Sequence, residues 1–231
     1  MLEKTIFWAG DSTVKENKIE TYPQTGIAQA MDRFLKMGVR IVNMAENGRS
    51  TKSFLAENRF KPVIDLACEG DFVFIQFGHN DAKKEDPVRY TTPEEYKQNL
   101  MYMANKAREK GAIPIFITPC ARRKFENGVY IYGGHKPYHD AMCELAIKEN
   151  ILCIDLTATS EKFLDKMGEQ KTEKLFMNLN PNEVDNPKFK DGQIDNTHFT
   201  YYGAVLMANL LSNEMRKFKV FESILFDENN T

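Results

Sequence analysis

Ser12, His198 and Asp195 have the side-chain types that acyl transfer to a nucleophilic hydroxyl requires. Ser12 follows the first apolar run in the segment TIFWAGDSTV, residues 5–14. A serine hydroxyl is a poor nucleophile until a base removes its proton, and an imidazole can do so near neutral pH. Among the four histidines we select His198, because Asp195 precedes it by three residues in DNTH and can orient the ring. The three residues are therefore candidates for a nucleophile, a base and an orienting acid.

Each of these residues also has a structural alternative. Asp, Ser and Thr side chains accept hydrogen bonds from free N–H groups at helix N-termini, so GDST is also typical of a helix cap. In the same way Asp195 and His198 are candidates for capping the last helix, and Asp11 for fixing the turn beside Ser12. The choice depends on where the fold places these side chains.

The hydrophobic pattern predicts alternating strands and helices. Short apolar runs predict parallel strands covered on both faces, at residues 5–9, 40–44, 72–77, 113–118 and 151–155. Longer segments with helical spacing predict helices at residues 26–37, 53–67, 93–110, 138–149 and 202–217. Such repeats favour an open parallel sheet between two layers of helices. No linker or internal repeat divides residues 1–231, so we expect a single domain.

Polar segments follow the predicted strands, and ligands of such folds bind at the carboxyl ends of the strands. GDST follows the first strand, AENGRST the second, GHND the third and TPCARR the fourth. Gly48 and Asn80, in the second and third of these segments, are candidates for donating hydrogen bonds to a carbonyl oxygen that gains negative charge. Residues 169–196 are polar without a clear period, and we expect them to form a long excursion near the same edge.

The composition limits the classes of partner. Hydrophobic residues make up 42% of the chain and charged residues 28%, as in ordinary globular proteins. Lys and Arg number 31 against 33 Asp and Glu, so the net charge of −2 gives no electrostatic case for nucleic acid or an anionic membrane. No apolar stretch approaches the ~18 residues of a membrane span. The start, MLEKTIFWAG, has too short an apolar run for a signal peptide, so we expect a cytoplasmic protein.

The cysteines show no C-x-x-C pair, so the sequence predicts no metal site. Each lies in or beside an apolar run, where a reduced thiol packs as a small hydrophobe. We expect free core cysteines, with one disulfide left open, at Cys68, Cys120, Cys143 and Cys153.

The four polar segments, in their order, resemble the sequence blocks of the SGNH, or GDSL-type, hydrolase superfamily, from Gly10 to His198. AGDSTV, FGHND and DGQIDNTHFTYYGA are similar to the rhamnogalacturonan acetylesterase branch, whose members remove acetyl groups from pectic polysaccharide. The resemblance implies a flavodoxin-like three-layer α/β/α sandwich with a five-stranded parallel sheet. It also implies that no metal or organic cofactor is needed, and it leaves protein partners open.

The resemblance also implies roles for the site residues. Ser12 would be the nucleophile, His198 the general base and acid, and Asp195 its orienting partner. The backbone N–H groups of Ser12 and Gly48, with the Asn80 side chain, would form the oxyanion hole. Extracellular members have a signal peptide that this start does not resemble, so an acetylated oligosaccharide is a better expected substrate than polymeric pectin.

Further residues are candidates for contacts with the sugar: Asp11, Arg49, His79 and Tyr201. For His79, a structural role in bracing its loop is favoured over substrate contact. His135 and His139, in GGHKPYH, form a second imidazole pair. Because Pro137 predicts a helix start between them, we expect both at the surface or the rim of the site.

Three other classes of function fit parts of the sequence less well. A binuclear metallophosphoesterase needs an early D-x-H and a G-N-H, whereas this chain has GHND and no earlier histidine. An acetylxylan esterase, a lipase or a thioesterase of the same superfamily stays open, although the polar residues 169–196 suit a hydroxyl-rich ligand better than an acyl chain. A catalytically silent carbohydrate-binding protein is disfavoured, because binding alone needs neither nucleophile nor base.

Overall fold

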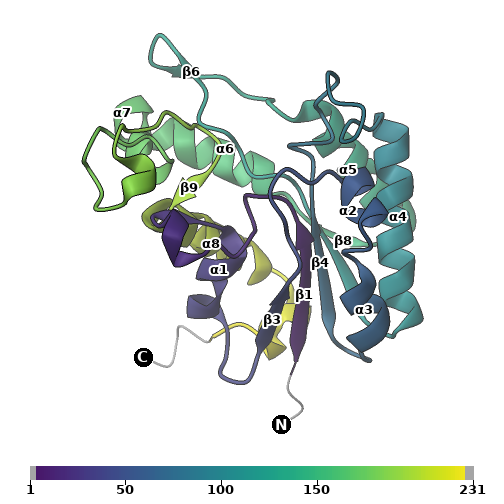
Figure 1. Ribbon diagram of the computed structural model, residues 1–231. Helices are drawn as coiled ribbons and strands as arrows, with labels where there is room; N and C mark the ends of the chain where they lie inside the picture. The colour runs from purple at the N-terminus through teal and green to yellow at the C-terminus, as the bar shows by residue number, and fades with distance from the viewer. Residues whose placement is uncertain (1–3, 227–231) are drawn as a thin grey trace.

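A five-stranded parallel sheet forms the centre of the computed structural model, which describes residues 4–226 (Figure 1). The strand order β3-β1-β4-β5-β8 places β1 between β3 and β4. The bounds are β1 Thr5–Gly10, β3 Arg40–Asn43, β4 Phe72–Gln76, β5 Ile113–Ile117 and β8 Leu152–Ile154. Each predicted strand is therefore confirmed, with ends that shift by at most one residue. The predicted α/β class is confirmed as well.

The two faces of the sheet receive alternate side chains of the same strand. In β1, Ile6 and Trp8 contribute to the core on one face, whereas Phe7 and Ala9 contribute to the core on the other. Side chains alternate in this way because successive residues of a strand point to opposite faces. Every residue of β1 and β4 is buried, which explains why these strands are apolar almost throughout.

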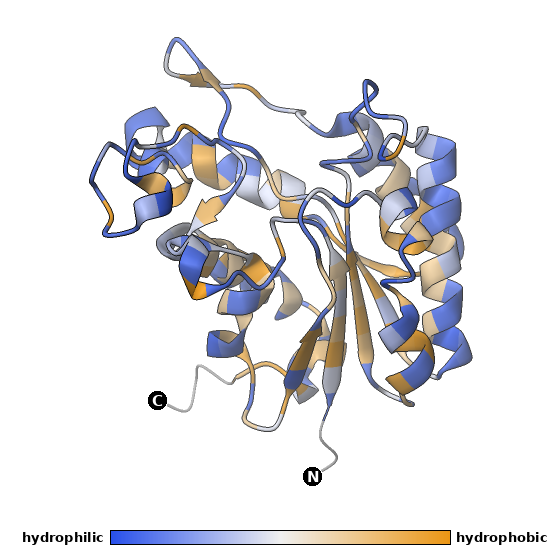
Figure 2. Cartoon of the chain, in the orientation of Figure 1, coloured by the Kyte–Doolittle hydropathy of each residue, from blue (hydrophilic) through white to orange (hydrophobic). Residues whose placement is uncertain are grey.

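Helices cover both faces. The face of Ile6 and Trp8 is covered by α1 Ile27–Ala30, α6 Leu156–Met167 and α8 Tyr201–Met215. The opposite face is covered by α2 Thr51–Ala56, α3 Lys61–Leu66, α4 Pro93–Glu109 and α5 Lys136–Glu149. Figure 2 shows hydrophobic strands between the two layers and hydrophilic residues on the outward side of α4. The arrangement is the expected three-layer sandwich.

Three helical segments differ from the sequence prediction. The predicted helix 53–67 is two helices, α2 and α3, because a turn with Asn58 at φ 53° interrupts it. The predicted helix 26–37 is α1 followed by a 3-10 turn, Met31–Phe34. Helix α6 was not predicted, although Asp155 caps it by accepting a hydrogen bond from Ala158 N at 2.9 Å.

The excursion of residues 169–196 is more ordered than its composition suggests. It contains α7 Glu169–Thr172, two 3-10 turns at Glu173–Leu175 and Pro187–Phe189, and a small core of its own around Met177 and Phe189. Asparagine side chains contribute to this order. The side chain of Asn186, for example, caps the second 3-10 turn and donates to the Tyr22 carbonyl at 2.7 Å.

Two short antiparallel strand pairs lie outside the central sheet. β2 Gln24–Thr25 pairs with β9 Phe199–Thr200, and β6 Phe125–Glu126 pairs with β7 Val129–Tyr130. The first pair joins the segment after β1 to the segment before α8. It therefore brings an early and a late part of the chain together near the carboxyl end of β1.

The cysteines are free thiols, but not all of them are core residues. Cys120 is buried, Cys143 and Cys153 are half-buried, and Cys68 is exposed. The expected core position of Cys68 is wrong, because this residue lies in the loop between α3 and β4. Within residues 4–226, the helices all fall short of the length and apolarity that crossing a membrane requires.

Candidate active site

Ser12 lies in a tight turn directly after β1, at the carboxyl edge of the sheet. The Asp11 carbonyl accepts hydrogen bonds from Val14 N and Lys15 N, both at 3.1 Å. Oδ1 of Asp11 accepts from Thr13 N at 2.9 Å and from Thr13 Oγ1 at 2.8 Å. These bonds fix the turn as predicted for Asp11. No helix begins there, so the interpretation of Ser12 as a helix cap is wrong.

Gly10 is required by the close approach of the chain at this turn. A Cβ atom at Gly10 would lie 2.9 Å from Val14 Cγ2 and 3.2 Å from the Gln76 carbonyl oxygen of the neighbouring strand. Contacts of this length would force the turn away from β4. The glycine of the GDS segment therefore allows the serine to follow the strand without a break in the sheet.

His198 and Asp195 meet Ser12 although the serine and the histidine are 186 positions apart in the chain. Nε2 of His198 lies 2.8 Å from Ser12 Oγ, and Nδ1 lies 2.6 Å from Asp195 Oδ2. We assign the Nδ1–H tautomer, because the Asp195 carboxylate can only accept a hydrogen bond when ionised. In that tautomer the lone pair of Nε2 accepts the Ser12 hydroxyl proton. The sequence prediction that these three side chains converge is met by the geometry.

The backbone around Asp195 holds the carboxylate in position. Its Oδ1 accepts from Thr197 N at 2.8 Å and from His198 N at 3.0 Å. The Asn178 side chain accepts from Asp195 N at 2.9 Å, so the excursion supports this turn. Burial raises the pKa of Asp195, but the bonds from His198 outweigh it and the pKa lies below its usual value. The carboxylate is therefore ionised beside the imidazole at neutral pH.

Gly48 and Asn80 lie in the loops after β3 and β4, on either side of β1. Gly48 has φ +72°, a conformation that favours glycine. One amide N–H of Asn80 donates to the Arg49 carbonyl at 3.1 Å, which ties the two loops together. The amide has a second N–H. The strand order therefore places candidate oxyanion donors in the loops after both strands that flank β1.

Asp81, the last residue of GHND, fixes this loop to the start of α2. Its Oδ1 accepts from Thr51 N at 3.0 Å, from Thr51 Oγ1 at 2.6 Å and from Thr91 Oγ1 at 3.0 Å. Burial raises the pKa of Asp81 to about 7 against the effect of these bonds. Asp81 is thus a buried anchor that holds Asn80 in place.

His79 and His135 form a buried pair rather than a second exposed imidazole pair. Their ring centroids are 4.2 Å apart, and His135 is only 3% exposed. The expected surface position of His135 is therefore wrong, because the chain folds it against His79 behind the GHND loop. Burial, with the Arg122 and His198 charges, holds the pKa of His79 well below its usual value. Burial and His79 lower the pKa of His135 to about 2.

Arg122 is a residue near the site that the sequence prediction did not select. Its Nε lies 3.4 Å from His79 Nδ1, and its Nη2 lies 3.4 Å from the His79 carbonyl oxygen. The segment TPCARR after the fourth strand was the available signal, since it ends at the same edge of the sheet. Arg122 brings a positive charge to the GHND loop.

The four residues predicted to contact a sugar differ in exposure. Asp11 and His79 are buried, at 1% and 4% exposed. Arg49 is half-buried and pairs with Glu57. Tyr201, at the start of α8, hydrogen-bonds Arg33 and is 38% exposed. Of these residues, only Arg49 and Tyr201 present substantial surface.

A separate group of side chains has the donor atoms of a metal site: His139, Cys143 and Asp155. The expectation of no metal site rested on the lack of C-x-x-C spacing, and this group has none. The available signal was H-x-x-x-C, which places both side chains on one face of a helix. His139 is half-buried on α5, so its predicted place outside the core holds.

Sequence comparisons find related proteins that align with most of the chain. Residues 9–203 match the model of the GDSL-like Lipase/Acylhydrolase family. The rhamnogalacturonan acetylesterase RhgT of Bacillus subtilis is 37% identical over 92% of this chain and 90% of its own. A probable rhamnogalacturonan acetylesterase of the same organism, YesY, is 39% identical over 92% of each chain.

Solved structures share the fold. A Bacillus subtilis protein superposes with a TM-score of 0.80 at 23% identity, over 93% of this chain and 56% of that one. This chain therefore spans a little over half of that protein. An acetylxylan esterase from Geobacillus stearothermophilus superposes with a TM-score of 0.59 at 15% identity, over 94% and 95% of the two chains.

Proposed function

The chain belongs to the GDSL-like lipase/acylhydrolase family, and from that premise we propose that it is a serine esterase that removes O-acetyl groups from carbohydrate. The observation that carries the proposal is the pair of hydrogen bonds that His198 makes, with Ser12 Oγ at 2.8 Å and with Asp195 Oδ2 at 2.6 Å. An imidazole held between a carboxylate and a hydroxyl is arranged to take the hydroxyl proton.

In the first half-reaction His198 Nε2 takes the proton of Ser12 while Oγ attacks the carbonyl carbon of the acetyl ester. The Asp195 carboxylate keeps the Nδ1–H bond and stabilises the positive charge on the ring. Collapse of the tetrahedral intermediate breaks the bond to the sugar oxygen, which leaves with the proton from Nε2. Ser12 then carries an acetyl group.

In the second half-reaction water takes the place of the sugar. His198 removes a proton from the water, which attacks the acetyl carbon, and then returns the proton to Ser12 Oγ as acetate leaves. The proton moves only between Nε2 and oxygen atoms in both halves. The residues therefore complete the cycle as acid and base without a cofactor.

The oxyanion of each intermediate would accept hydrogen bonds from Ser12 N, Gly48 N and the Asn80 side chain. β1 lies between β3 and β4, so loops from both neighbours flank Ser12. Donors held in place before the reaction stabilise charge without reorganisation. Asp81 and the Arg49 carbonyl hold the Asn80 loop through the bonds described above.

The names of the relatives favour acetylated rhamnogalacturonan oligosaccharides as the substrate of this chain. Two relatives that align with 92% of the chain have rhamnogalacturonan acetylesterase in their names. We assign Arg49 and Tyr201 to contacts with the sugar, since both are partly exposed, and Asp11 and His79 to support of the Ser12 and Asn80 loops. An acetylxylan esterase, a lipase or a thioesterase remains the alternative activity.

The test measures acid released from matched substrates by the purified chain. Acetylated rhamnogalacturonan oligosaccharides should be hydrolysed with a higher kcat/KM than acetylated xylan oligosaccharides, long-chain aryl esters or acyl thioesters. The Ser12→Ala variant serves as the blank for each substrate. A preference for the thioesters or long-chain esters would overturn the carbohydrate assignment, and activity equal to the blank would overturn the esterase assignment.

A further inference from the structure

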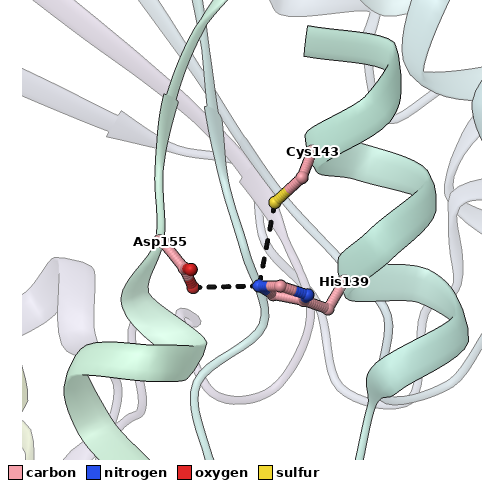
Figure 3. Close-up of side chains that lie close together, drawn as sticks. All are labelled: His139, Cys143 and Asp155. Carbon is pink, nitrogen blue, oxygen red and sulfur yellow. Dashed lines mark hydrogen bonds and ion pairs between the residues drawn. The ribbon is translucent and has the colours of Figure 1, made fainter. Parts of the chain in front are cut away.

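Helix α5 and strand β8 bring an imidazole, a thiol and a carboxylate together outside the Ser12 site (Figure 3). Nε2 of His139 lies 3.1 Å from Asp155 Oδ1 and 3.7 Å from Cys143 Sγ. One donor atom from each of the three residues lies within 4.8 Å of the others. Three different ligating groups thus point at one small volume.

The placement of these donors follows from regular secondary structure. His139 and Cys143 are four residues apart on α5, so they share a face of the helix. Asp155 directly follows β8, two residues after Cys153, so both side chains leave the strand on the same side. The helix and the end of the strand therefore present three donors to one another.

Outer contacts orient two of the donors. Nδ1 of His139 lies 2.9 Å from Asp140 Oδ1, which leaves Nε2 to face Asp155 and Cys143. A carboxylate on the far nitrogen is the usual support of a metal-bound histidine. Oδ1 of Asp155 accepts from Ala158 N at 2.9 Å and from Thr118 Oγ1 at 3.2 Å. The His139 side chain is 24% exposed and that of Asp155 44% exposed, so an ion can enter from solvent.

The separations fit a tetrahedral ion. Bonds of about 2.0–2.3 Å from zinc to nitrogen, oxygen and sulfur place the ligand atoms about 3.3–3.7 Å apart. The two separations at His139 Nε2, 3.1 Å and 3.7 Å, lie at or near this range. The remaining pair, Cys143 Sγ and the Asp155 carboxylate, lies within 4.8 Å, so side-chain shifts of about 1 Å close the group around an ion.

We propose that His139, Cys143 and Asp155 bind a Zn²⁺ ion, with a water molecule from solvent as the fourth ligand. The donor set of thiolate, imidazole and carboxylate suits zinc, whereas magnesium and calcium prefer oxygen alone. Binding converts the Cys143 thiol to a thiolate and releases its proton, and the proton on His139 Nε2, to solvent. The ion ties α5 to β8, a strand at the edge of the sheet.

The test titrates chelator-stripped protein with Zn²⁺ against a chromogenic competitor, and with Co²⁺ as a spectroscopic probe. The expected result is one tightly bound ion per chain, and a cobalt spectrum with tetrahedral bands and a thiolate charge-transfer band. Cys143→Ser should remove that band and weaken zinc binding by more than about 100-fold, because losing a ligand costs more than losing an outer partner. The exposed thiol provides the control Cys68→Ser, which should bind as the wild type does.

Two further measurements test the zinc site if Cys143→Ser folds poorly. His139→Gln should weaken zinc binding to a similar extent, and zinc should raise the unfolding temperature of the wild type but not of this variant. Unchanged binding in both variants, a cobalt spectrum without the thiolate band, or binding lost only in His198→Ala would overturn the proposal. The last result would place the ion at the Ser12 site.

Discussion

Two imidazoles of this protein lie between an acid and a nucleophilic side chain, yet their rings are used differently. His198 faces Asp195 with Nδ1 and Ser12 alone with Nε2. His139 also faces an aspartate, Asp140, with Nδ1, but its Nε2 is shared by Asp155 and Cys143. A ring nitrogen directed at one hydroxyl is placed to take its proton, whereas His139 has an aspartate at each ring nitrogen, and a cation would replace the hydrogen on Nε2.

The backbone around the two nucleophilic atoms differs as well. Ser12 lies in a turn between two loops, so backbone N–H groups near it are available for an oxyanion. Cys143 lies within helix α5, where backbone N–H groups bond carbonyls of the previous turn. The composition of the two groups is similar, but only the Ser12 group has the surroundings that acyl transfer needs.

The largest expected effect is the loss of activity when the Ser12 hydroxyl is removed. Ser12→Ala should lower kcat for a small aryl acetate by about 10⁴–10⁶-fold, because no nucleophile remains beside His198. The exposed serine near the end of the described chain gives the matched control, Ser223→Ala, which should retain wild-type turnover. Retention of more than a tenth of the activity in Ser12→Ala would contradict the assignment.

The next effect concerns the donors that flank Ser12. Asn80→Ala should lower kcat by about 10²–10³-fold with a smaller change in KM, because one oxyanion donor is lost in the transition state. Steady-state kinetics with the same aryl acetate measure both constants. Asn213, an exposed asparagine of α8, gives the control Asn213→Ala. A change in KM alone would show that Asn80 only binds substrate.

The third effect tests the outer support of His139. Asp140→Asn should weaken zinc binding by about 10–100-fold, since the carboxylate orients the ring and raises its basicity. Competition titration measures the affinity. Glu144→Gln, an exposed position on the same helix, removes the same charge and should change the affinity by less than about threefold. Equal losses in both variants would attribute the effect to net charge.

The smallest effect is a pH dependence of stability at Asp195. The pKa of this carboxyl is lower in the folded protein than in the unfolded chain, where it is about 3.9. Ionisation of Asp195 therefore stabilises the fold above the unfolded pKa. This stabilisation is lost as the pH falls through the pKa of the folded state. Urea unfolding should therefore show a larger difference in free energy between wild type and Asp195→Asn near pH 6 than near pH 3. A constant difference would contradict the ionic character of the Asp195–His198 pair.

The sequence was sufficient for the strands and for the turn residues at their ends. Apolar runs such as that of residues 5–9 predict buried parallel strands because side chains alternate locally along a strand. Helix boundaries were less predictable, and α6 was missed, since its cap Asp155 also closes a strand. The burial of His135 was predicted wrongly, because only packing against His79 removes that ring from solvent.

By itself the sequence determined which groups are available for chemistry: a serine after the first strand, an asparagine after the third, and an acid and a histidine before the last helix. Their types and local turns depend on neighbouring residues and are therefore visible in the chain. The fold alone decided which of these groups meet. Strand order put β1 between its two flanking loops, the pairing of β2 with β9 brought His198 to Ser12, and α5 packed against β8 placed His139 and Cys143 beside Asp155. Such contacts depend on burial of apolar surface between distant segments, which no local pattern specifies.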